Sequence, residues 1–225
     1  MFDIFKKKPE TPQFTARDFL FGDMPFSEWP NATSKQEKHE PWRSFATARE
    51  QLTGGDKTSS ISTLRKILAM PNLESRHYLQ AWHFLRELGE TPTETEAQQL
   101  YGVVVEVALR NGLDMVAAYS DGTARYFNYS GAAIIWERPD NSLDPSVHAL
   151  LGVGQKVLRE IGPWEGQRPP EPPQDQVRIN LLAPAGLHFG QGSFEQLERD
   201  SMGGPMIGAA TRLMQDLIAK SERRA

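Results

Sequence analysis

The fold is decided by residues 101–137, which read YGVVVEVALRNGLDMVAAYSDGTARYFNYSGAAIIWE. β-Branched and aromatic residues, which favour strands, fill this stretch. Three tight-turn pairs divide it, namely Asn111-Gly112, Asp121-Gly122 and Ser130-Gly131, and Asn-Gly is the strongest short signal for a β-hairpin. Four short strands joined by tight turns predict an antiparallel meander.

A helix is predicted over residues 145–161, directly after the meander. Pro145 suits its first turn, Asp144 is expected to cap it, and apolar residues recur at core spacing. Gly152 and Gly154 lie inside this helix, and each lowers its helicity by about 1 kcal/mol relative to Ala. We therefore expect both glycines to pack closely against the sheet.

A proline-rich segment follows, with five of the 16 prolines between residues 163 and 173. Consecutive prolines hold the chain extended, so this segment is expected to cross one face of the molecule. Apolar alternation then predicts a strand over 176–182, and residues 187–189 are expected to pair with it. A last helix is predicted after Gly203-Gly204-Pro205.

Upstream of the meander, the apolar spacing is helical. It predicts helices over 42–53, 59–70 and 74–89, the second capped by Thr58, Ser59 or Ser60, and a short helix near Glu94. His77 and His83 lie six residues apart on the third helix, which is about 600° of rotation, so they face different sides. We expect no metal site there and place both histidines at the surface or at the boundary of the core.

Composition excludes several classes of protein. The chain has no cysteine, so disulfides and thiolate metal sites are ruled out. Its formal net charge is -4 and it has no dense basic block, which argues against nucleic-acid binding. No apolar run approaches the roughly 20 residues needed to span a bilayer. The sequence therefore predicts a cytoplasmic protein without cofactors and without nucleic-acid or membrane partners.

The N-terminal arm is rich in aromatic residues. Nine of the 21 aromatic residues lie within the first 45 positions, and side chains of this kind gain much from burial. The arm is expected either to pack on its own domain or to bind a protein partner, in trans or by self-association. The candidate partner-binding residues are Phe14, Phe19, Phe21, Phe26 and Trp29.

Glycine-rich loops between residues 186 and 205 provide the second candidate site. Glycines before a helix allow backbone N–H groups to approach an anion, and a nearby histidine supplies a hydrogen bond or a proton. The candidate ligand-binding residues are His188, Gly190, Gly192, Ser193, Gly203 and Gly204. No phosphate-loop or nucleophile motif completes this group, so no catalytic residue is assigned.

Together these patterns predict an α+β protein in three parts. Residues 1–40 form the arm and a polar linker, 41–100 a helical subdomain, and 101–225 an antiparallel sheet with two main helices; alternatively, 41–225 form one continuous domain. The first functional hypothesis is a non-enzymatic protein-interaction or regulatory protein. The alternative is a small-molecule or anion-binding protein, or a hydrolase, that uses the loops 186–205.

Overall fold

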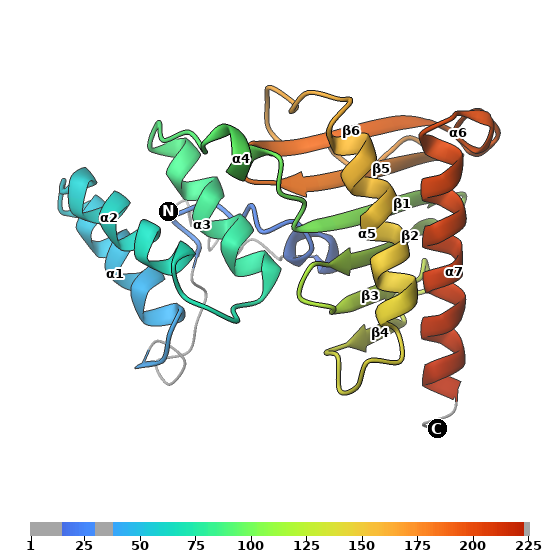
Figure 1. The fold of residues 1–225 in the computed structure, drawn as a ribbon, viewed down its shortest axis with the longest axis horizontal. Coiled ribbons are helices and arrows are strands. Elements are labelled where there is room, and N and C mark those ends of the chain that lie inside the picture. The colour runs from blue at the N-terminus through green and yellow to red at the C-terminus, as the bar shows by residue number, and fades with distance from the viewer. Residues whose placement is uncertain (1–14, 30–37, 223–225) are drawn as a thin grey trace, which may run out of the picture.

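The fold is α+β, as predicted, with helices on both sides of one antiparallel sheet (Figure 1). The computed structural model describes residues 15–29 and 38–222. Its six strands lie in the order β4-β3-β2-β1-β5-β6. Their bounds are β1 (Gly102–Leu109), β2 (Gly112–Tyr119), β3 (Ala124–Phe127), β4 (Ala133–Trp136), β5 (Gln176–Ala183) and β6 (Gly186–Ser193).

The predicted meander is confirmed, because β1 to β4 are neighbours in sequence order. β5 pairs with the free side of β1, placing Val104 opposite Asn180. β6 is longer than the three residues predicted, since all eight of its residues pair with β5. Its Gly190 and Gly192 have low strand propensity, and strand pairing overrides that preference.

Helices α5 (Asp144–Leu158) and α7 (Gly203–Glu222) lie side by side on one face of the sheet (Figure 1), and the short α6 (Phe194–Arg199) precedes α7. Val103 and Val105 of β1 point into this core, as strand alternation requires. The expected N-cap of α5 was wrong. Its N-cap is Leu143, while Asp144 is the first helical residue and pairs with Arg138.

Only one of the two α5 glycines packs closely. A Cβ on Gly154 would lie 2.9 Å from Val103 Cγ2 and 3.0 Å from Leu100 Cδ2. A Cβ on Gly152 would have no atom within 4 Å, so the expectation for Gly152 was wrong. The reason is rotational, since positions two apart on a helix point about 200° away from each other.

Helices α1 (Trp42–Thr53), α2 (Lys57–Leu68) and α3 (Ser75–Glu87) form the N-terminal helical part, and α4 (Glu94–Ala97) leads into β1. They enclose a core of their own around Phe45, Trp82 and Phe84. The cap of α2 is Asp56, which accepts a hydrogen bond from Ser59 N–H; the predicted Thr58, Ser59 or Ser60 cap was wrong. α3 also reaches the sheet, because Leu79 packs beside Val104 and Tyr119.

The second face of the sheet is covered by the arm and by the proline segment. The described part of the arm begins with a short 3-10 helix, η1 (Ala16–Phe19), whose Thr15 and Asp18 form a capping box. Leu20 and Phe21 then pack on Val104 and Met115. We refer to this side as the arm face.

A buried charge network joins the arm, the sheet and the proline segment. Glu106 of β1 is 0% exposed, and its carboxylate accepts hydrogen bonds from Arg17 Nε at 2.5 Å and from Asn180 Nδ2 at 3.0 Å. Arg178 Nη1 lies 3.7 Å from the same carboxylate. The two arginines also donate to the carbonyls of Pro169 and Pro170, at 3.0 Å and 2.6 Å. A carboxylate buried this deeply is stable only with such partners.

Within the described ranges, no helix has the length and apolar character that a membrane span requires.

Candidate ligand-binding cleft

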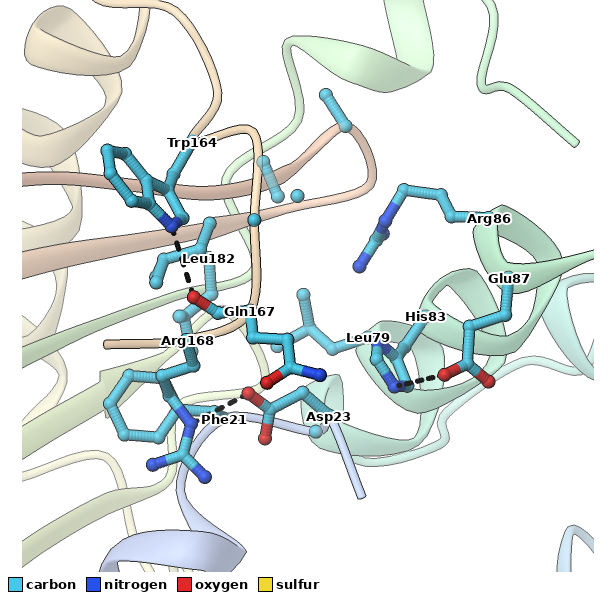
Figure 2. A pocket seen from close by; sticks show the side chains of 16 residues that line it. Phe21, Asp23, Leu79, His83, Arg86, Glu87, Trp164, Gln167, Arg168 and Leu182 are labelled. Carbon is cyan, nitrogen blue, oxygen red and sulfur yellow. Dashed lines mark hydrogen bonds and ion pairs between the residues drawn. The ribbon is translucent and has the colours of Figure 1, made fainter. Parts of the chain in front are cut away.

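A cleft of about 360 Å³ opens beside the C-terminal half of α3 (Figure 2). Four segments that are distant in sequence form its walls: the arm, α3, the proline segment and the turn between β5 and β6. We call it the α3 cleft. Its polar lining comprises Asp23, His83, Arg86, Glu87, Gln167 and Arg168, and its apolar lining includes Phe21, Leu79, Trp164, Leu182 and Leu187.

The arm is held against α3 by backbone contacts that only certain residues permit. Gly22 has φ +63, and a Cβ there would lie 2.7 Å from the Arg76 carbonyl oxygen, so glycine is required at this crossing. Next to it, Gln80 bonds both the N–H and the carbonyl of Met24, at 3.0 Å and 2.8 Å. Tyr119 donates its hydroxyl to the Leu20 carbonyl at 2.8 Å. The arm therefore forms a fixed wall.

Arg168 joins the proline segment to the arm across the lower side of the cleft. It pairs with Asp23 at 2.7 Å and with Asp18 at 3.0 Å, and its guanidinium lies 4.4 Å from the centre of the Phe21 ring. Desolvation favours the neutral arginine, but these carboxylates outweigh it and raise the pKa of Arg168. Its charge is thus already balanced within the protein.

Arg86 differs from Arg168 because it lacks a carboxylate partner. Its Nη1 donates to the Pro184 carbonyl at 2.6 Å. Among the described residues, no carboxylate lies within ion-pair distance of its guanidinium. Burial lowers the pKa of Arg86 to about 10, although the carboxylates of Asp23 and Glu87 oppose this shift at longer range, so Arg86 remains a cation at neutral pH. An incompletely balanced, largely buried cation is electrostatically unfavourable and attracts an anion.

His83 and Glu87 lie one helical turn apart on the same wall. The His83 Nε2 atom is 3.5 Å from Glu87 Oε1. Burial lowers the pKa of His83 to about 4, so the imidazole is neutral at pH 7 and this contact is not an ion pair. Burial also raises the pKa of Glu87, although Arg86 opposes the shift. The carboxylate is 47% exposed and therefore keeps contact with water.

The cleft has the chemistry of a binding site. It combines one unbalanced cation, polar groups and an apolar floor, which is typical of small-molecule sites of this size. In the described part of the chain, no three His, Asp or Glu side chains gather as metal ligands. No serine or threonine lines this cleft beside His83, so the lining does not form a hydroxyl nucleophile with its base.

The predicted glycine-loop residues are not brought together in one cavity. His188 is 3% exposed and lies 3.2 Å from the Gly186 carbonyl. Gly190 and Gly203 line a separate apolar cavity of about 90 Å³ whose lining does not include His188, Gly192 or Ser193.

Helix capping accounts for most of the remaining loop residues. Ser193 caps α6 by accepting from Gln196 N–H. Asp200 accepts from Gly203 N–H at 2.7 Å, and Gly204 N–H bonds the Asp200 carbonyl at 2.9 Å. The amides expected to bind an external anion are therefore occupied by the protein's own groups.

The described part of the aromatic arm, residues 15–29, packs mainly in cis. Phe21 is buried on the arm face, while Phe26 and Trp29 pack against the core of α1–α3. Phe19 is 43% exposed, and Phe14 lies outside the described residues. His77 is also buried, at 8% exposure, against the Trp42 ring, so its predicted location at the surface or boundary was wrong.

The cleft residues themselves were missed by the sequence reasoning. Asp23 and Arg168 are 145 positions apart, and no local motif links them. Two signals were present in the sequence: the glycine at position 22, and adjacent opposite charges at Arg86 and Glu87 near the end of an amphipathic helix.

A scan against protein-family models and searches of curated proteins and of solved structures find no match to this chain. These comparisons therefore assign it neither a family nor an activity.

Proposed function

We propose that this protein binds a small organic anion, carrying a carboxylate or a phosphate, in the α3 cleft. The observation that carries the proposal is Arg86, a largely buried guanidinium without a carboxylate partner among the described residues. Arginine matches the planar geometry of a carboxylate and binds it through two hydrogen bonds. The proposal keeps the anion chemistry expected from the glycine loops and moves it to a different site.

A binding role without catalysis fits the lining of the cleft. We infer the cytoplasm as its compartment, where small organic anions are abundant and a chain needs no disulfides. Hydrolysis is less well supported, because no serine or threonine lines the cleft beside His83.

Titration of the purified protein with 4-methylpentanoate, 3-phenylpropanoate and inorganic phosphate tests this proposal. At 100 times its dissociation constant a ligand stabilises the fold by about 2.7 kcal/mol, which raises the Tm by about 5–10 °C for a chain of this size. Arg86→Gln is expected to abolish the shift. Arg212→Gln is the matched control, since Arg212 is an exposed arginine of α7 paired with Asp216.

The proposal fails if neither these anions nor leucine and phenylalanine, which carry the same carboxylate, raise the Tm. It also fails if Arg86→Gln responds as strongly as the wild-type protein does.

Protein interaction is a second proposal, supported by the exposed aromatic surface that remains. Phe19 is 43% exposed, and Trp164, at the edge of the cleft, is 49% exposed. Aromatic side chains of this kind are enriched in interfaces. Affinity capture with the wild-type chain and with Phe19→Ser tests it: a partner retained equally by both would exclude Phe19 from the interface.

A further inference from the structure

The charged side chains along the α3 cleft differ in whether an opposite charge pairs with them. Arg168 pairs with both Asp18 and Asp23, so these three groups leave no free cation and carry one excess negative charge. Two groups remain: the cation of Arg86 and the anion of Glu87. Figure 2 shows the Arg86 guanidinium reaching into the cleft while Glu87 points toward His83.

Arg86 and Glu87 form no ion pair, although they are consecutive and each favours the charged form of the other at longer range. Neighbouring residues on a helix point about 100° apart, and i,i+1 side chains do not face one another. The titratable side chain that contacts the Glu87 carboxylate is His83, whose Nε2 lies 3.5 Å from Glu87 Oε1. Because the pKa of His83 is about 4, that ring carries no charge at pH 7. Among the described residues, neither Arg86 nor Glu87 is therefore in an ion pair with a charged partner, and Asp23 and Glu87 act on the Arg86 charge only at longer range.

We propose that the ligand of the α3 cleft is a small zwitterion of the amino-acid type, with its carboxylate on Arg86 and its ammonium group on Glu87. This inference rests on the proposed function and defines the class of anion. A simple anion would balance Arg86 but would be repelled by Glu87, whereas a zwitterion balances both groups.

The apolar lining indicates where the rest of such a ligand lies. Leu79, Leu182, Leu187 and the Phe21 ring form an apolar part of the same cleft. Trp164 is held at its edge by a hydrogen bond from its Nε1 to the Gln167 carbonyl, at 3.1 Å. An apolar side chain of the size of leucine or phenylalanine is suited to this surface, and the cleft volume of about 360 Å³ accommodates it.

Matched pairs of ligands test the inference by calorimetric titration. Leucine and phenylalanine carry both charges; 4-methylpentanoate and 3-phenylpropanoate are the same molecules without the amino group. A charge-assisted contact contributes roughly 1.5–3 kcal/mol, so at least one amino acid is expected to bind wild-type protein about 10- to 100-fold more tightly than its deaminated partner.

Two substitutions separate the roles of the charges. In Glu87→Gln, the amino acid and its deaminated partner are expected to bind with about equal affinity. Binding of 4-methylpentanoate is expected to be retained or improved. Arg86→Gln is expected to weaken both members of each pair. The matched control is Glu195→Gln on α6, where Glu195 is 71% exposed and paired with Arg199.

The outcomes distinguish the two proposals. If the deaminated acids bind wild-type protein as tightly as the amino acids, or if Glu87→Gln leaves the preference unchanged, the zwitterion inference is overturned and anion binding stands. If neither member of either pair binds and phosphate is also inactive, both proposals are overturned.

Discussion

Replacing Glu106 by Gln is the most informative perturbation of this fold. The substitution preserves shape and removes the one negative charge that the described residues place between Arg17 and Arg178, which are 8% and 4% exposed. A glutamine amide oxygen can still accept from one donor, but its NH₂ group would face another donor, because Asn180 Nδ2 lies 3.0 Å from the present carboxylate. Two guanidinium groups would then be buried without charge compensation.

The expected cost is about 3–5 kcal/mol of unfolding free energy, the range for removing one partner of a buried ion pair. This is a large part of the 5–15 kcal/mol that stabilises a typical domain. The cost should fall on the arm and the proline segment, since Arg17 and Arg178 also hold the carbonyls of Pro169 and Pro170.

Urea unfolding followed by tryptophan fluorescence and far-UV circular dichroism measures the loss. Glu195→Gln serves as the control, and its exposed ion pair predicts a change below about 1 kcal/mol. A triple variant with Arg17→Met, Glu106→Leu and Arg178→Met is expected to recover most of the stability, because an apolar triad leaves no charge buried. If Glu106→Gln unfolds within 1 kcal/mol of the wild type, the buried network does not hold the arm as argued.

Two further predictions follow from the same structure. Because burial lowers the pKa of His83 from 6.5 to about 4, the folded state binds fewer protons than the unfolded state between these values, so stability falls as the pH drops through this range. The loss from His83 reaches about 3 kcal/mol near pH 4, and His83→Gln should reduce the fall between pH 7 and pH 4 by that amount in urea titrations; an equal fall in both proteins would contradict the burial argument. On α5, Gly152→Ala should raise the unfolding free energy by about 0.5–1 kcal/mol, while Gly154→Ala should lower it, because its Cβ would meet Val103 at 2.9 Å. Thermal melts of the pair measure the contrast, and a gain for both variants would refute the close packing at Gly154.

The secondary structure was largely predictable because its signals are local. Turn pairs such as Asn111-Gly112 and the β-branched run from Val103 to Val107 fall within a few residues of the strands they define. The predicted helix over 42–53 matches α1 at both ends. The predictions were wrong where residues distant in sequence determine the local structure. β6, for example, extends to Ser193 because β5 pairs with it along the whole length of β6.

The candidate site was not predictable in the same way. Asp23, His83, Arg86 and Arg168 come from three separate segments, and each has an ordinary local sequence context. The glycine-rich loops show the converse. Gly203 looks like an anion site in sequence, but in the fold its amide bonds Asp200.

The amino-acid sequence by itself determined the α+β class, the meander and the absence of thiol chemistry, since periodicity, turn residues and composition act over a few neighbours. Only the tertiary structure decided that residues 20–29 of the aromatic arm pack in cis and that Glu106 is buried among two arginines and an asparagine. It also decided that Arg86 faces a cleft without an ion-paired carboxylate in the described chain, while Arg168 is ion-paired with Asp18 and Asp23. The physical reason is that compensation of a charge depends on which groups lie within about 4 Å of it, and here those groups are up to 150 residues away in sequence.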